Sequence, residues 1–154
     1  MTTQIIEAKN GRITEQMEYI AKKEGVSPEF VREKVASGRV VILKNNKRDD
    51  VIPTAVGEGM TVKINANIGT SMERSNVQQE LDKVRIIEAT GADVLMDLST
   101  GSDIDGTRKQ IIAATKLPIG TVPMYQAGKE ALDEHKDIAK LSKDKLFSDI
   151  EMIL

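Results

Sequence analysis

Three segments decide the predicted fold: KINANIG (residues 63–69), VLMDLSTG (94–101) and GTVPMYQA (120–127). In each, an apolar run meets polar residues, and corresponding positions, Asn67, Met96 and Tyr125, follow one another at intervals of 29 residues. An interval of roughly 30 residues is the size of a unit of one strand and one helix, and such units place ligand-binding groups at the carboxyl ends of their strands. We therefore predict an α/β fold whose first three βα units begin a (βα)8 TIM-type barrel and face one site.

Helical periodicity predicts the helices of these units. Apolar residues recur at helical spacing over residues 73–90 and again over 103–114, and a glycine or proline follows each stretch. A last amphipathic stretch predicts a helix over residues 142–154. These helices would cover a parallel sheet, as the βα rhythm requires.

The expected strands are short. Val62 and Ile64 alternate as strand residues should, and further strands are expected over 94–96 and 119–122. Pro123 lacks the backbone donor that a sheet requires. We therefore expect pairing to stop there and the chain to open into a loop carrying Tyr125.

Residues 1–60 lack this rhythm and are predicted to form a separate helical and strand region, so the barrel units would occupy 61–154. Thr14 is a favoured cap for a helix ending near Gly25, and Ser27 before Pro28 predicts a second helix. A strand is expected over residues 39–43. The sequence thus divides into two regions.

Composition excludes several functions. Lysine and arginine (22) nearly balance aspartate and glutamate (24), so the formal net charge is −2 and no basic surface for nucleic acid is expected. No stretch approaches the roughly 18 apolar residues of a membrane span, and there is no cysteine for a disulfide, a thiolate nucleophile or a thiolate-held cluster. We expect a cytoplasmic protein that contacts neither nucleic acid nor membrane.

Neutral polar side chains near the strand ends are candidate ligand groups. Asn65 and Asn67 alternate on one strand face, and carboxamides offer both a donor and an acceptor, although asparagine also closes turns. Tyr125 has an apolar ring with a polar hydroxyl.

Two ionisable residues are also considered. Asp97 is interpreted first as an acceptor for loop amides and second as a base. His135 stands among charged residues and is predicted to be solvated rather than a ligand.

Together, VKINANIGTS, GADVLMDLSTG and PIGTVPMYQA resemble the phosphomethylpyrimidine synthase family of thiamine biosynthesis, in matching order and spacing. The leading segment from Gly11 to Ile42 also resembles that family's N-terminal region. The resemblance implies a (βα)8 barrel lyase of the radical S-adenosylmethionine class that converts 5-aminoimidazole ribotide into 4-amino-5-hydroxymethyl-2-methylpyrimidine phosphate. It also implies that Asn67, Met96 and Tyr125 bind this substrate.

The resemblance further implies cofactors and assembly. Family members use S-adenosylmethionine, a 4Fe-4S cluster held by a C-terminal Cys-x-x-Cys-x4-Cys segment, and a divalent metal such as zinc, and the complete enzyme is expected to be a homodimer. This sequence contains no cysteine, so its own residues cannot hold the cluster by those ligands. No metal ligand and no catalytic residue is assigned within it.

Two further hypotheses remain open. The substrate pocket would look alike in a paralogue that makes hydroxybenzimidazole from the same ribotide, and a non-catalytic partial barrel would bind a ligand or partner without turnover. A parallel barrel closes with about eight strands and a typical length of roughly 250 residues. We therefore expect the 154 residues to be an N-terminal portion of a longer enzyme and inactive alone.

Three barrel strands leave two edges and several apolar helix stripes without partners, so the isolated chain is expected to self-associate or fold poorly. Sedimentation velocity across a dilution series, with a thermal melt, measures this. A sharply melting monomer that is stable to dilution would contradict the expectation.

Overall fold

The described residues, 3–153 of the computed structural model, divide into two units. The first comprises the described residues of Met1–Ile64 with Lys116–Pro118, and the second comprises Asn65–Thr115 with the described residues of Ile119–Leu154. Within residues 3–153, no helix is long and apolar enough to cross a membrane.

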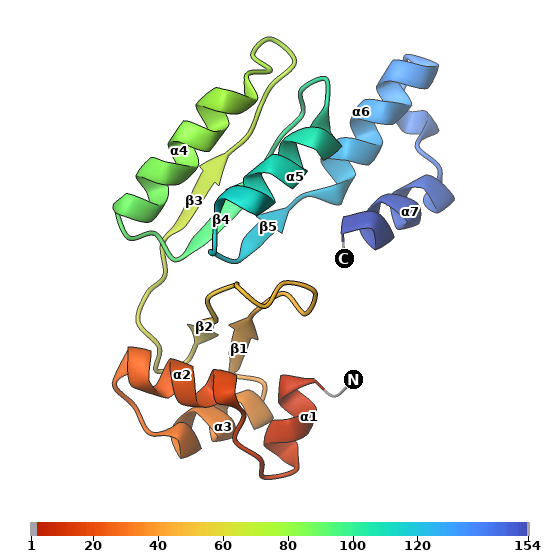
Figure 1. Cartoon of the computed structure of the whole chain (residues 1–154). Helices are drawn as coiled ribbons and strands as arrows, with labels where there is room; N and C mark the ends of the chain where they lie inside the picture. Colours follow the sequence, from red (N-terminus) through yellow and green to blue (C-terminus); the bar gives the residue numbers. More distant parts are fainter. Residues whose placement is uncertain (1–2, 154) are drawn as a thin grey trace. The chain divides into compact units, whose positions relative to one another are not determined.

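The first unit packs three short helices with a two-stranded antiparallel sheet (Figure 1). Its core is made of small and medium apolar side chains from all three helices and both strands. Its elements are α1 (Gln4–Lys9), α2 (Glu15–Glu24), α3 (Pro28–Ala36), β1 (Val40–Leu43) and β2 (Thr54–Gly57).

Capping residues confirm two predicted helices in this unit. The Thr14 hydroxyl accepts the backbone N–H of Met17 at 3.3 Å, and the Ser27 hydroxyl accepts that of Phe30 at 3.2 Å. Gly25 ends α2 with φ of 72°, a left-handed conformation that favours glycine. Local hydrogen bonding therefore sets both helix starts, as the sequence predicts.

Two elements of this unit, α1 and β2, are not predicted from the sequence because neither has a periodic apolar pattern. The six-residue helix α1 buries one side chain, Ala8, and is too short to show helical periodicity. Strand β2 follows Pro53 and is defined by its pairing with β1, in which Val40 lies opposite Gly57. The pairing depends on the tertiary structure, so the local sequence of β2 does not predict it.

The second unit is a mixed α/β structure built on a parallel sheet in the order β3-β4-β5. The predicted parallel pairing and the two helices between the strands are confirmed, although the first helix, predicted from residue 73, begins at Val77 after its cap Asn76. Figure 1 shows α4 and α5 side by side across one face of the sheet. The last helix agrees with its expected range, apart from Leu154, which lies outside the described residues. The elements are β3 (Asn65–Ile68), α4 (Val77–Ala89), β4 (Val94–Asp97), α5 (Ile104–Ala114), β5 (Ile119–Thr121), α6 (Pro123–His135), the 3-10 turn η1 (Ile138–Lys140) and α7 (Lys143–Ile153).

The two faces of this sheet differ in chemistry. One packs on the helices, where Leu95 and Ile68 from the strands meet Val84 of α4 and Ile111 of α5 in a buried cluster. Fully burying such a side chain stabilises the fold by about 1.5–3 kcal/mol. Because side chains alternate along a strand, the residues between these point to the opposite face.

The first strand begins later than predicted. Val62 is 95% exposed and Ile64 is 60% exposed, and both precede β3. Their alternation is typical of a strand, but pairing starts only at Asn65, which lies opposite Val94 of β4. The partner strand, rather than the local pattern, sets the start of β3.

The loop expected after Pro123 is also wrong, because α6 begins at this residue. Proline's fixed φ suits the first helical position, and its missing N–H has no helical partner there. The helix was not predicted because its buried face carries small or polar residues and so lacks an apolar stripe: Gln126, Ala127, Gly128 and Ala131.

A buried ion pair in the first unit joins the last residue of α2, Glu24, to Lys63. Lys63 Nζ lies 2.9 Å from Glu24, and the backbone N–H and hydroxyl of Thr61 donate to the same carboxylate at 2.7 and 2.9 Å. The Glu24 and Lys63 side chains are 2% and 6% exposed. Burial alone would raise the pKa of Glu24, but the hydrogen bonds from Lys63 and Thr61 lower it overall.

Lys63→Met should lower the free energy of unfolding by about 3 kcal/mol at pH 7, because it leaves a buried carboxylate without its cation. Since the folded pKa of Glu24 lies below the ordinary value of 4.5, the pair stabilises fully above that value and loses its effect as pH falls through the folded pKa. The difference between wild type and variant should therefore shrink in acid.

Urea denaturation of the full chain across pH measures both effects. Lys22→Met, at an exposed lysine of the same helix as Glu24, is the matched control and should change little. A pH-independent difference between Lys63→Met and wild type would contradict the assignment.

Candidate functional site

One row of side chains crosses the sheet near the carboxyl ends of its strands. Asn67 of β3 lies opposite Met96 of β4, and Met96 lies opposite Gly120 of β5. Paired residues of parallel strands point to the same face, and this face is the one opposite the buried cluster of Leu95 and Ile68. The structure thus brings Asn67 and Met96 together as neighbours.

Exposure decreases along the row from β3 to β4 and β5. Asn67 is exposed, and Met96 and Gly120 are half-buried. Asn65 is exposed on the same face and lies opposite Val94, one layer further from the strand ends. The pair of asparagines on one strand face is therefore present as predicted.

Tyr125 does not belong to this row. It lies in the first turn of α6, where its backbone N–H donates to Val122 at 3.0 Å, and its residue is 49% exposed. The residue that completes the row on β5 is Gly120, five positions earlier. The second 29-residue interval, from Met96 to Tyr125, therefore ends at the start of the helix that follows the strand.

Asp97 connects the loops that leave β3 and β4. Its Oδ1 accepts the backbone N–H of Ser99 at 3.0 Å and the Ser99 hydroxyl at 2.6 Å. The Ser99 oxygen in turn accepts the backbone N–H of Thr70 at 3.1 Å. Asp97 is 1% exposed, so the first interpretation, an acceptor for loop amides, is confirmed.

Gly69 brings the same two loops into backbone contact. Its φ is 145°, and a Cβ atom at this position would lie 2.6 Å from the backbone nitrogen of Ser99 and 2.7 Å from the carbonyl carbon of Leu98. The Gly69 N–H donates to the buried carboxylate of Glu80 on α4 at 2.8 Å. The strand end is thus fixed to its neighbour and to its helix.

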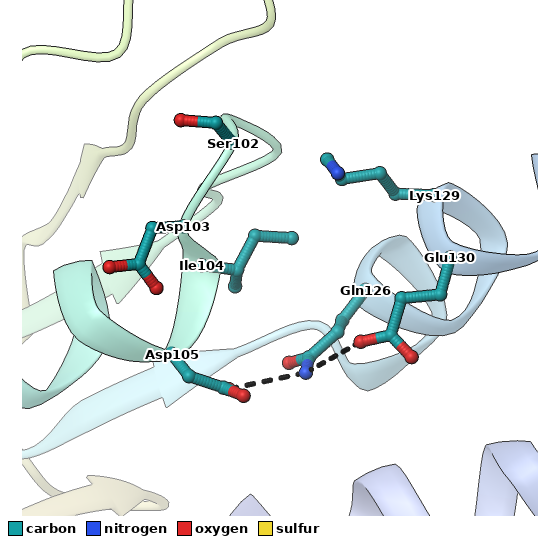
Figure 2. Close-up of a pocket in the computed structure, with 7 residues that line it drawn as sticks. All are labelled: Ser102, Asp103, Ile104, Asp105, Gln126, Lys129 and Glu130. Carbon is teal, nitrogen blue, oxygen red and sulfur yellow. Dashed lines mark hydrogen bonds between the residues drawn. The ribbon is translucent and has the colours of Figure 1, made fainter. Parts of the chain in front are cut away.

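A small polar pocket of about 150 Å³ opens between the start of α5 and α6 (Figure 2). In Figure 2, Gln126 lies between the carboxylates of Asp105 and Glu130, and its side-chain nitrogen donates to both, at 3.2 and 3.1 Å. The pocket is lined by Ser102, Asp103, Ile104, Asp105, Gln126, Lys129 and Glu130.

Hydrogen bonds and ion pairs engage the charged and amide side chains of this pocket. Arg108, nearly buried on α5, donates to Gln126 at 2.8 Å and to Asp105 at 3.2 Å. Burial would raise the pKa of Glu130, but hydrogen bonds from Lys145 and Gln126 lower it overall. These side chains link three helices, which assigns them a structural role. Sequence reasoning missed this network because its members come from separate helices.

Lys145 joins this network to α7. It bonds to Glu130 and to the fully buried Asp149, the latter at 2.7 Å, and these hydrogen bonds raise the pKa of Lys145 well above its usual range. The lysine therefore stays charged and holds α7 against α6.

His135 is the last residue of α6 and is partly exposed, and its Nε2 lies 3.8 Å from the Glu134 carboxylate.

The donor set of this chain does not fit an iron–sulfur cluster. The sequence has no cysteine, and the structure groups no three histidine or acidic side chains for a metal within residues 3–153. Cluster iron is held chiefly by cysteine thiolates. No chemical step through a cluster is therefore derived from these residues.

The chain has an α/β fold with a row of exposed and half-buried residues near the carboxyl edge of a parallel sheet, and known proteins resemble it along nearly its whole length. Residues 3–153 match the model of the radical SAM ThiC family. The chain therefore belongs to this family, and the resemblance in its strand-end segments is confirmed.

Among the relatives named phosphomethylpyrimidine synthase, that of Syntrophus aciditrophicus is 46% identical to this chain and that of Pyrococcus furiosus is 48% identical. A third, from Eubacterium limosum, is 46% identical and is named 5-hydroxybenzimidazole synthase BzaB. Each match covers 97% of this chain and 35% of the relative. The chain thus spans about a third of the length of these curated relatives.

Gly69→Ala should destabilise the second unit by more than about 1 kcal/mol, because a Cβ there meets backbone atoms and its φ disfavours a side chain. Gly91→Ala is the matched control, since Gly91 also has positive φ, 81°, but nothing lies within 4 Å of its added Cβ. Urea denaturation of both variants measures the difference. Equal losses would show that the close approach to Leu98 and Ser99 contributes nothing.

Proposed function

We propose that this chain supplies part of the substrate pocket of a radical S-adenosylmethionine enzyme that converts 5-aminoimidazole ribotide into 4-amino-5-hydroxymethyl-2-methylpyrimidine phosphate. In this proposal the parallel sheet is the start of a (βα)8 barrel, and its open face lines the barrel interior. Asn67, Met96 and Tyr125 are the proposed substrate-binding residues.

The observation that carries the proposal is the row of Asn67 and Met96 at the carboxyl edge of the sheet, on the face opposite the packed helices. Parallel-barrel enzymes bind substrates at this edge, because the loops that follow the strands converge there. Family membership adds the class of chemistry, since relatives over the same residues are named phosphomethylpyrimidine synthases.

Each proposed contact suits a neutral, planar, polar heterocycle. The Asn67 carboxamide offers a donor and an acceptor, so it can orient a ring substituent without adding charge. The Met96 thioether is polarisable and favours contact with an aromatic ring. The Tyr125 hydroxyl adds one further hydrogen bond from the half-exposed start of α6. The three residues would position the substrate and take no part in proton transfer.

The cofactors and assembly of the whole enzyme are part of the same proposal. S-adenosylmethionine, a 4Fe-4S cluster and a divalent metal such as zinc would supply the radical chemistry, held by groups outside these residues because this chain has no cysteine. We further propose a cytoplasmic homodimer that binds neither nucleic acid nor membrane. The 154 residues alone would then bind substrate weakly and not turn it over.

A second candidate function is formation of hydroxybenzimidazole from the same ribotide. The relative from Eubacterium limosum, named 5-hydroxybenzimidazole synthase BzaB, is as similar to this chain as one of the pyrimidine synthases. Both products would start from one substrate, so the same three contacts serve either reaction. The mass of the product, formed by protein expressed from the complete reading frame, distinguishes them.

Asn67→Ala and Tyr125→Phe should each weaken ribotide binding about tenfold, the effect of one lost hydrogen bond of roughly 1.4 kcal/mol. Both side chains are exposed, so folding should be unaffected. Calorimetric titration with 5-aminoimidazole ribotide, using protein from the complete reading frame, measures the dissociation constant.

Two substitutions serve as controls. Tyr19→Phe alters the only other tyrosine, which is similarly exposed but lies on α2 of the first unit, and should leave binding unchanged. Asn65→Ala removes the same group about 7 Å further from the strand end and should have a smaller effect than Asn67→Ala. Wild-type binding without turnover would favour a non-catalytic barrel, and no binding at all would overturn the proposal.

A further inference from the structure

Gly120 occupies a position where an added side chain would crowd its neighbour on β4. It lies in β5 directly opposite Met96 and completes the row that begins with Asn67. A Cβ atom built on Gly120 would lie 3.1 Å from both Sδ and Cε of Met96. Carbon atoms in ordinary contact are about 3.5–4.0 Å apart, so the thioether end of Met96 already occupies the space beside Gly120.

Backbone conformation does not explain this glycine. Gly120 is absent from the glycines with positive φ, and it sits within a regular stretch of the parallel sheet. An alanine is therefore compatible with its backbone, and valine or isoleucine is the usual choice in a buried parallel strand. What distinguishes the position is its neighbour, the Met96 side chain.

We propose that Gly120 is a positioning residue of the substrate pocket: by having no side chain, it allows the thioether of Met96 to lie across β5, at a fixed place in the row. The inference rests on the proposed ribotide site. Methionine has three rotatable side-chain bonds and fills whatever space it is given. Its position against a substrate ring must therefore be set by its surroundings, and Gly120 is the neighbour within its own row that leaves the space open.

The chemical consequence is a defined distance between the Met96 thioether and a bound ring. A thioether lying across β5 presents sulfur and methyl to a planar ring, while Asn67 on β3, on the other side of β4, provides the polar contact. A methyl group on Gly120 would move the thioether by a few tenths of an ångström or turn it to another rotamer. Either change would alter the distance between Met96 and a ring held by Asn67.

The decisive variant is Gly120→Ala in protein from the complete reading frame, with 5-aminoimidazole ribotide as the probe. We expect roughly tenfold weaker binding, with KM raised more than kcat falls, and an unchanged melting temperature. The matched control is Gly128→Ala on α6, where an added Cβ would lie 3.0 Å from the end of the flexible Ile138 side chain, away from the row. This control carries a similar steric conflict and should bind ribotide normally.

A double-mutant cycle separates positioning from a direct clash with substrate. If Gly120 acts through Met96, then Gly120→Ala should have little further effect in a Met96→Ala background, where the thioether is gone. A full, additive loss in that background would overturn the inference, as would unchanged binding by Gly120→Ala alone. If Met96→Ala itself binds ribotide normally, or wild type does not bind it, the proposed site fails and this inference falls with it.

Discussion

The close approach of two backbones at the ends of β3 and β4 is the constraint on which the proposed site depends. Gly69 lies against Leu98 and Ser99 with no space for a side chain, and its N–H is bound to Glu80 of α4. The Asp97 carboxylate then holds Ser99, whose hydroxyl accepts the Thr70 N–H. Together these contacts fix the ends of β3 and β4 relative to each other. The register of the strands then aligns Asn67, Met96 and Gly120, and no contact among their side chains is needed for this alignment.

The two faces of the sheet divide structural from proposed binding roles. The helix-covered face carries the apolar cluster, and charged side chains of α5, α6 and α7 are held by hydrogen bonds and an ion pair: Asp105 and Arg108 bond to the Gln126 amide, and Glu130 pairs with Lys145. The opposite face presents a carboxamide, a thioether and a bare backbone. Charge therefore stabilises the helix layer, while neutral groups remain for a ligand.

The accuracy of sequence-based prediction follows how local each signal is. The helices that follow Thr14 and Ser27 can be predicted because each capping side chain bonds to a backbone amide only three residues away. The helix after Pro123 was missed because its buried face, with Gln126 and Gly128, lacks an apolar stripe. The start of β3 was misplaced because Val62 and Ile64 alternate like strand residues, although no strand lies beside them. Pairing partners distant in sequence decide such boundaries.

The sequence alone determined the βα rhythm, the parallel strands and the matching positions of Asn67 and Met96 on neighbouring strands, since strand-end spacing is a property of consecutive units. Its segments also indicated the family to which the chain belongs. Only the tertiary structure decided that Gly120, rather than Tyr125, completes the row, and that Gln126 joins two carboxylates in a helix-linking network. The reason is physical: register and side-chain contact depend on which residues of distant segments lie opposite one another, and no interval along one chain specifies that.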